Sequence, residues 1–208
     1  MNSRMISRRI LLCSLAVASF APPLEAFAAG DTGPAAQVQS FYDTLLQAMK
    51  GGAKLGFKGR RDLLAPAIEH SFDLPLMTRL TTGLEWQNLS AEDQQKLVAA
   101  FSEFSIATYA SQFDDYSGER FEVDPNPVKT ESGDDVVKTK LIQVKDDPVQ
   151  LDYLMRQSPA GWKIIDIYLS GTISQLAARR SEFSTVLRRD GIAGLINLLH
   201  QKTAQLAG

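Results

Sequence analysis

The apolar residues of this 208-residue chain change their spacing about half way along. Before residue 112 they recur every three or four positions, a spacing that buries one face of an α-helix. After residue 120 the spacing becomes that of strands, bounded by Asp, Pro and Gly turns, and helical spacing returns at the end. The expected strands are residues 120–123, 136–145, 149–157 and 162–169. Helices on either side of an antiparallel run of strands indicate an α+β fold, with a curved sheet of about four strands wrapped by helices.

The first half contains four predicted helices. The first covers residues 35–50 and ends at Gly51-Gly52, so residues 51–59 are expected to form a flexible, mobile connection. A short helix at 62–70 follows despite its internal proline, and Asp73 can cap the next helix. Ser90, with Asp93 three residues later, nearly matches a capping box and begins a long helix to about residue 111.

The last part reads as one strand followed by two amphipathic helices. The strand at 162–169 is rich in Ile, Tyr and Leu and short of polar residues, which is typical of a strand covered on both faces. Gly171 ends it. An apolar stripe of helical spacing follows, and Gly191 suits the C-terminal cap of this helix before a second stripe begins at Ile192.

Three segments of the sequence together resemble a known protein family. They are GWKIIDIYLSGTISQLAARRSEFSTVLRRDGIAGLI at 161–196, FDLPLMTRLTTGLEWQNLSAEDQQKLVAAFSEFSIATYA at 72–110, and LDYLMR at 151–156. This ordered set is similar to the MlaC family, also called toluene-tolerance or auxiliary transport proteins, and to its hopanoid-associated branch HpnM. The resemblance implies a fold similar to the nuclear transport factor 2-like (NTF2-like) cone, extended by extra helices.

The resemblance also implies a function. Proteins of this family are soluble carriers that hold lipid acyl chains in an apolar cavity and move lipid between the two membranes of a Gram-negative envelope. The expected ligand is therefore phospholipid or hopanoid, and no cofactor is expected. The expected partners are an inner-membrane MCE protein with its ABC transporter and an outer-membrane lipoprotein complex.

The N-terminus predicts export to the periplasm. Arg4, Arg8 and Arg9 precede an apolar run at 10–21, and the small residues Ala26 and Ala28 fit cleavage after residue 28. The paired arginines leave both the general secretory and the twin-arginine routes open. An uncleaved anchor is the weaker alternative, because about 12 apolar residues fall short of the roughly 20 that span a bilayer.

Removal of residues 1–28 changes the composition of the remaining chain. It takes three of the 22 basic residues, one of the 24 acidic residues and the single cysteine, which leaves a formal charge of −4 and no disulfide or thiolate site. This charge argues against a nucleic-acid surface, which would require a concentrated basic face. Residues 29–208 are long enough for a single domain with a sizeable core, and no linker or repeat divides them.

The candidate ligand-binding side chains are large apolar residues on the last two strands and on the helices. Leu151, Tyr153 and Met155 share one face of their strand, as do Ile165, Ile167 and Leu169 on the next. Without the resemblance, a densely filled core is the simpler interpretation. With it, we predict a lipid cavity lined by these six residues together with Leu76, Leu80, Phe101, Phe104 and Tyr109.

The sequence offers few candidates for chemistry. His70 and His200 lie far apart without ligand-like neighbours, so no metal site is predicted. Asp152-Tyr153 and Asp166 resemble the Asp and Tyr of cone-shaped isomerases, although we expect these carboxylates to be structural partners of Arg79 or Arg156. The alternatives to a carrier are therefore an isomerase-like enzyme and a non-binding envelope scaffold, and we predict no enzyme.

Two arginine pairs follow Gly171 in the last part of the chain. Such pairs usually form a solvated helix face. The alternative is a docking surface for a lipid headgroup or a membrane partner, and we assign partner docking to Arg179, Arg180, Arg188 and Arg189.

Overall fold

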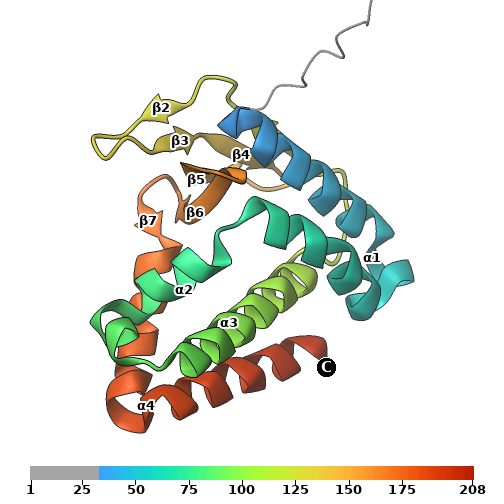
Figure 1. Ribbon diagram of the computed structural model, residues 1–208. Coiled ribbons are helices and arrows are strands. Elements are labelled where there is room, and N and C mark those ends of the chain that lie inside the picture. Colours follow the sequence, from blue (N-terminus) through green and yellow to red (C-terminus); the bar gives the residue numbers. More distant parts are fainter. Residues whose placement is uncertain (1–32) are drawn as a thin grey trace, which may run out of the picture. The chain divides into compact units, whose positions relative to one another are not determined.

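The computed structural model describes residues 33–208, so the predicted signal peptide at 1–28 lies outside the described residues. Helices come first, strands follow, and one long helix ends the chain, which confirms the predicted α+β class (Figure 1). Within residues 33–208, no helix combines the length and hydrophobicity that crossing a membrane requires. The elements are α1 (Pro34–Ser71), α2 (Leu74–Thr82), the 3-10 helix η1 (Gly83–Asn88), α3 (Ala91–Gln112), β1 (Arg120–Val123), β2 (Val128–Lys129), β3 (Asp135–Val137), β4 (Thr139–Ile142), β5 (Val149–Ser158), β6 (Gly161–Leu169), β7 (Ile173–Ser174) and α4 (Gln175–Ala207).

The first helix is longer than the sequence predicts, because it includes residues 51–59 and continues to Ser71. Gly52 and Gly56 still interrupt it, with φ values of 38° and 61° that residues with a Cβ rarely adopt. The buried Arg60 holds the interruption in place. Its Nη1 donates to the carbonyl of Gly52 at 3.0 Å and its Nε to that of Ala110 at 2.8 Å. The predicted interruption is therefore confirmed at Gly52 and Gly56, but it is shorter than the connection predicted at 51–59, and Arg60 bonds it to the end of α3.

Side-chain caps begin the next two helices where the sequence predicts them. Asp73 Oδ1 accepts a hydrogen bond from the backbone N–H of Leu76 at 2.9 Å. Ser90 Oγ accepts one from the backbone N–H of Asp93 at 3.1 Å. Each bond satisfies a donor that the first turn of a helix leaves without a backbone partner. The predicted start of α3 and its end near residue 111 are both confirmed.

All seven strands form one antiparallel sheet with β5 at its centre, in the order β1-β4-β5-β3-β2, with β6 also paired to β5 and β7 to β6. Val137 lies opposite Tyr153, and Lys140 lies opposite Gln150. Both pairs follow the same register along β5. The strands β3 and β4 therefore correspond to the single strand predicted at 136–145, which is interrupted at Lys138. The four predicted strands are confirmed, and the two-residue strands β2 and β7 are additional.

The pairing of β5 with β6 contains one β-bulge. Tyr153 lies opposite Ile167, but Met155 lies opposite Ile164, so Ile165 is an extra residue on β6. An extra residue reverses the faces of the residues beyond it relative to strict alternation. Ile164, not Ile165, therefore shares the face of Tyr153 and Met155, and it belongs to the main hydrophobic cluster.

The junction between α1 and α2 is attached to β6. Phe72 forms a parallel bridge with Ile164, and the N–H of Asp73 donates to the carbonyl of Ile164 at 2.9 Å. Nearby, Lys163 Nζ donates to the carbonyl of His70. These bonds hold Phe72 and the start of α2 against the sheet.

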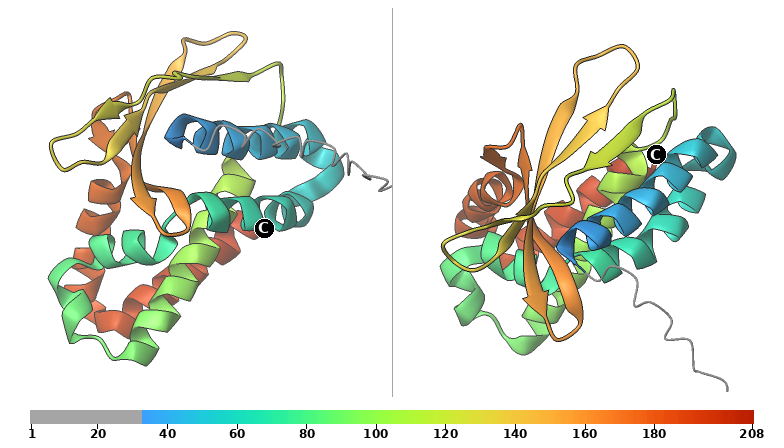
Figure 2. Two further views of the ribbon diagram at one scale, coloured as in Figure 1. Left: turned by 45° about the horizontal axis from the view of Figure 1, so that its top comes forward. Right: turned by 90° about the horizontal axis from the view of Figure 1, so that it is seen from above.

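The last helix is divided at Gly191, which has a φ of 67°. In Figures 1 and 2 the part before Gly191 passes α2, and the part after it runs alongside α3 to the C-terminus. The predicted break at Gly191 and the second helix after it are confirmed. This bend lets one helix cover both α2 and α3.

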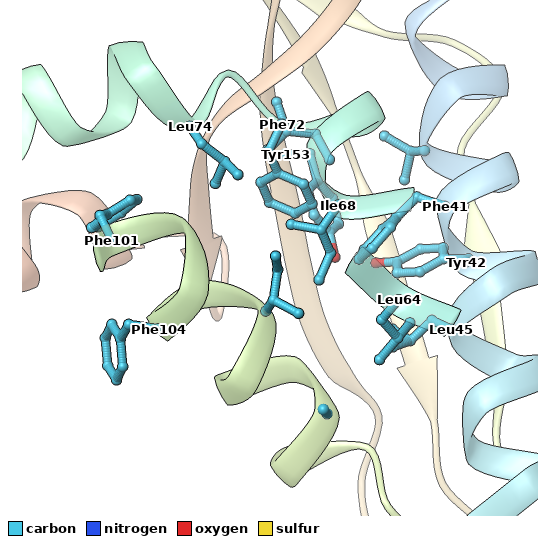
Figure 3. Close-up of a cluster of buried hydrophobic side chains, with 14 of the residues drawn as sticks. Phe41, Tyr42, Leu45, Leu64, Ile68, Phe72, Leu74, Phe101, Phe104 and Tyr153 are labelled. Carbon is cyan, nitrogen blue, oxygen red and sulfur yellow. The ribbon is translucent and has the colours of Figure 1, made fainter. Parts of the chain in front are cut away.

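Aromatic side chains form much of the core between α1 and the sheet. Tyr42 stacks on Phe121 with 4.0 Å between ring centroids, and Phe41 meets Phe72 edge to face at 5.2 Å. Figure 3 shows Phe41, Tyr42 and Phe72 near Tyr153, with Phe101 on α3 at some distance from them. Phe72 and Tyr153, together with side chains of α3, line a common cavity.

Candidate functional site

A cavity of about 260 Å³ lies between the sheet, α3 and the first part of α4. Strands β5 and β6 supply one side, α3 supplies another, and the rest comes from the end of α1, from α2 and from the start of α4. The volume is close to the lower end of the roughly 300–1,000 Å³ found for small-molecule pockets.

Most of the side chains that line the cavity are apolar or aromatic. They are Ile68, Phe72, Leu74, Met77, Phe101, Tyr109, Phe113, Leu151, Tyr153, Ile167, Leu169 and Leu176. The polar lining residues come from α3, β6 and α4, and they are Ser105, Thr108, Gln112, Asp166, Gln175 and Arg179. A wall of this composition suits a ligand that is mainly hydrocarbon and carries a small polar part.

Six residues that the sequence assigns to lipid binding come together around this cavity. They are Phe101, Tyr109, Leu151, Tyr153, Ile167 and Leu169. The two strands contribute as alternation predicts, because Tyr153 lies opposite Ile167 and Leu151 opposite Leu169 on the same face. Their role in lipid binding stays a prediction.

Leu76 and Leu80 do not line the cavity. The α2 residues that face the interior are Leu74, Met77, Thr78 and Thr81, which are three or four positions apart. Leu76 and Leu80 lie on the neighbouring face of the helix and are only half-buried. The sequence prediction was wrong here, because it chose the wrong stripe of a short helix whose inner face includes two threonines.

Phe104 is buried but lies outside the cavity wall. Figure 3 shows its ring on the side of α3 away from Tyr153. It faces α4 instead, where the guanidinium carbon of Arg179 lies 4.7 Å and Lys202 Nζ 6.0 Å from its ring centroid. The expectation that Phe104 lines the cavity is therefore wrong.

Met155 and Ile165 also do not line the cavity. Met155 is fully buried within the main cluster, on the part of β5 beyond the bulge. Ile165 is buried as well, but the bulge turns it to the opposite face from the one that strict alternation predicts. A bulge leaves no clear signal in a run of similar apolar residues, so the sequence did not reveal it.

Several lining residues were not predicted from the sequence. Ile68 and Phe72 lie four positions apart at the end of α1, and Leu74 and Met77 lie three apart in α2. This helical spacing was a usable signal for both pairs. Phe113 and Leu176, beside the ends of helices, carry no comparable signal.

Of the tyrosines at and behind the cavity wall, Tyr42 and Tyr153 are buried and Tyr109 is partly buried. Tyr42, behind Tyr153, shares a 2.6 Å hydrogen bond with the hydroxyl of Thr139, and burial raises its pKa to about 12. Burial also raises the pKa of Tyr109 and of Tyr153. Phenol groups with raised pKa values remain protonated near neutral pH, so they can form hydrogen bonds with a ligand but are poor bases.

The two carboxylates considered for catalysis, those of Asp152 and Asp166, accept hydrogen bonds from neighbouring residues. Asp166 accepts hydrogen bonds from Ser174 Oγ at 2.5 Å and from the N–H of Leu176 at 3.0 Å, so it caps the start of α4. Asp152 Oδ2 accepts from Gln150 at 2.9 Å, and its buried Oδ1 has no partner among the described residues. The predicted pairing of either with Arg79 or Arg156 is wrong.

Arg156 instead binds Asp134, with Nη2 2.6 Å from the carboxylate. This bond holds the pKa of Asp134 below its usual range. Within residues 33–208, no group of three or more His, Cys, Asp or Glu side chains could hold a metal ion. His70 and His200 are both exposed.

The four arginines assigned to docking do not share one environment. Arg180, Arg188 and Arg189 are exposed, whereas Arg179 lines the cavity and lies against Phe104. Burial lowers the pKa of Arg179. Arg179 therefore does not lie on a solvated helix face with the other three, and it is the one cation of the cavity wall among the described residues.

A second hollow, of about 390 Å³, lies over β1, β4 and the start of β5. Its lining includes the charged residues Glu122, Asp124, Lys138 and Lys140. It lacks the apolar walls that a lipid tail requires, so the first cavity is the candidate site.

Comparisons with known proteins identify a family and a similar solved structure. Residues 39–201 match the family model described as MlaC protein. Among solved structures, the chain is similar to a phospholipid-binding protein from Ralstonia solanacearum in complex with a phospholipid. The two share 28% sequence identity with a TM-score of 0.73, over 84% of this chain and 99% of the other. No curated protein matches the chain.

Proposed function

Since the chain belongs to the MlaC family, we propose that it is a periplasmic lipid carrier that holds acyl chains in the cavity between β5, β6 and α3. The observation that carries this proposal is the apolar wall formed by residues from six different elements around one cavity. The phospholipid bound by the similar Ralstonia protein supports the same ligand class for this chain.

The energetics of the cavity suit a carrier. Each CH₂ group moved from water to an apolar wall gains roughly 0.8 kcal/mol, so a lipid tail can be held with little polar recognition. Side chains such as Leu151 and Ile167, which are partly exposed to the cavity, supply this surface. The neutral tyrosines and the capped Asp166 favour binding over acid–base catalysis, so we propose no enzymatic activity.

We propose phospholipid as the cargo. The hopanoid-associated branch of the family makes hopanoid the alternative cargo, and the same assay can test it. The predicted signal peptide at 1–28 supports delivery to the periplasm, where a carrier would exchange lipid with both membranes. The proposed partners are an inner-membrane MCE protein with its ABC transporter and an outer-membrane lipoprotein complex.

The proposal can be tested by lipid transfer across a porous barrier. Donor vesicles with labelled phospholipid and unlabelled acceptor vesicles are placed on opposite sides of a membrane that passes protein but retains vesicles. Residues 29–208 should move label to the acceptor side at a rate proportional to protein concentration. A parallel experiment, with donor vesicles that contain labelled hopanoid, compares the transfer of the two cargoes. Transfer no faster than without protein, for both lipids, would contradict the proposal.

A further inference from the structure

Arg179 is a cation in a cavity wall that is otherwise mostly apolar. It lies on the second turn of α4, whose start is fixed by the bonds of Asp166 to Ser174 and Leu176. Its guanidinium carbon lies over the ring of Phe104, 4.7 Å from the ring centroid, in a cation–π contact. The capped start of α4 and the ring of Phe104 therefore both help to fix the position of Arg179.

The guanidinium has no anionic partner of its own. Within residues 33–208, Arg179 takes part in no ion pair or side-chain hydrogen bond, although nine ion pairs are formed elsewhere. Glu182, one turn further along α4, is the nearest candidate, but Lys202 Nζ holds its carboxylate at 2.5 Å. Arginine remains charged in proteins, so its five N–H donors and its charge need an acceptor when water is limited.

A hydrogen-bonding group of the same cavity wall interacts electrostatically with this cation. Tyr109 also lines the cavity, and burial raises the pKa of its hydroxyl, while the charge of Arg179 opposes that increase. The tyrosine remains protonated near neutral pH and can donate a hydrogen bond. A guanidinium and a phenol hydroxyl together offer donors to one oxyanion, and arginine binds phosphate or carboxylate with paired N–H groups.

We propose that Arg179 binds the anionic group of the lipid, a phosphate or a carboxylate, and so fixes where the cargo sits relative to the apolar wall. This inference rests on the proposed carrier function and deepens it. It makes an anionic oxygen group part of what the cavity recognises. An uncharged hopanoid offers Arg179 no counterion, so the inference favours phospholipid or fatty acid as the cargo.

The test compares lipids that share acyl chains but differ in the polar end. Protein is loaded from vesicles containing phosphatidylglycerol or diacylglycerol with the same chains, or from oleate, and occupancy is measured by native mass spectrometry. The variants are Arg179→Met, which keeps an apolar contact with Phe104, and Arg179→Lys, which keeps the charge. Arg180→Met is the matched control, because Arg180 is the exposed neighbour outside the cavity wall.

Arg179→Met should reduce the preference for phosphatidylglycerol over diacylglycerol by about tenfold or more, since a lost charged hydrogen bond costs at least roughly that factor. Arg179→Lys should restore part of the preference, and Arg180→Met should leave it unchanged. Loss confined to phosphatidylglycerol assigns the site to phosphate, and loss confined to oleate assigns it to carboxylate. Arg179→Gln replaces Arg179→Met if the latter lacks a cooperative thermal transition.

Two outcomes would overturn the inference while leaving the carrier function intact. One is an Arg179→Met variant whose preferences for phosphatidylglycerol and for oleate over diacylglycerol are both unchanged. The other is an equal loss of phosphatidylglycerol and diacylglycerol, which would make Arg179 a packing residue only. Failure of the unmodified protein to take up any of the three lipids would instead contradict the proposed function itself.

Discussion

Asp166 on β6 accepts a hydrogen bond from the hydroxyl of Ser174 at 2.5 Å, and this pair fixes where α4 begins. Ser174 Oγ in turn accepts from the N–H of Ala177 at 2.9 Å, and Asp166 also accepts from the N–H of Leu176. The sheet and the last helix are therefore joined by one polar network at the edge of the cavity. The position of Arg179, one turn later, depends on it.

Loss of this network should destabilise the protein. We expect Ser174→Ala to lower the free energy of unfolding by about 1–2 kcal/mol and Asp166→Ala by about 1–3 kcal/mol, because buried donors lose their acceptor. The double variant should lose less than the sum, since both residues act in one network. Urea denaturation measures all three. Ser181→Ala, at an exposed position of α4, should change stability by no more than about 0.5 kcal/mol, and a strictly additive double variant would contradict the network.

Substitutions at two residues of β5 should distinguish an effect on core packing from an effect on lipid binding. Met155 is fully buried away from the cavity, and Leu151 is half-buried in its wall. We expect Met155→Ala to cost about 2–5 kcal/mol of stability with little change in lipid occupancy. Leu151→Ala should cost less stability and retain lipid less well. Chemical denaturation and native mass spectrometry give the two readouts, and a reversed pattern would mean that the lipid lies beside Met155, beyond the bulge, and not beside Leu151.

Alkaline pH should destabilise the fold through its buried tyrosines. Burial raises the pKa of Tyr42 from 10.0 to about 12, so the folded state keeps a proton that the unfolded state releases. The stabilisation is complete below pH 10 and falls as the pH rises toward 12, by about 2–3 kcal/mol for this residue. Tyr109 and Tyr153 act in the same direction.

The free energy of unfolding, measured by urea denaturation from pH 8 to pH 11, checks this expectation. It should be flat at the lower end and decline above pH 10. Tyr42→Phe should decline less steeply over the same range, whereas Tyr116→Phe, at an exposed position, should follow the unmodified protein. Equal slopes for Tyr42→Phe and Tyr116→Phe would show that Tyr42 does not contribute.

The exposed arginines of α4 remain the predicted docking surface, now without Arg179. A carrier must release its partner after exchange, so these contacts should be weak and salt-dependent. We expect charge reversal at Arg180, Arg188 and Arg189 to weaken binding to the inner-membrane MCE partner and to leave bound lipid unchanged. Surface plasmon resonance at several salt concentrations measures the binding. If affinity and salt dependence stayed the same, these arginines would be ordinary solvated residues.

The sequence predicted the elements better than the details that place the site. Apolar spacing and turn residues located the four main strands and the caps at Asp73 and Ser90. The glycines at 51–59 predicted an interruption, which Gly52 and Gly56 confirm, but the sequence does not show that Arg60 would bond to Gly52 and Ala110. Local patterns report local structure, and the bond of Arg60 to Ala110 joins residues that are 50 positions apart.

Local sequence patterns were also insufficient to place every residue of the candidate site. Alternation placed Leu151, Tyr153 and Ile167 correctly on one face, but one extra residue in β6 moved Ile165 to the other. Arg179 and Arg180 look equivalent in sequence, yet adjacent helix positions point in directions about 100° apart. Only the packing of α4 against α3 determines which of the two faces the cavity.

The most direct measurement is the lipid content of the protein itself. Residues 29–208, purified from periplasm without detergent, should carry bound lipid in native mass spectrometry. Ile167→Asp places a charge in the cavity wall and should abolish occupancy, because an unpaired charge beside acyl chains is costly. Ile173→Asp is the matched control, since Ile173 is exposed on the neighbouring β7.

Both variants must retain native circular dichroism and a cooperative thermal transition. We predict lipid in the unmodified protein and in Ile173→Asp, and none in Ile167→Asp. Apoprotein alone in the unmodified sample, even after incubation with phospholipid and hopanoid vesicles, would contradict the carrier function. Normal occupancy in folded Ile167→Asp would place the lipid elsewhere than in this cavity.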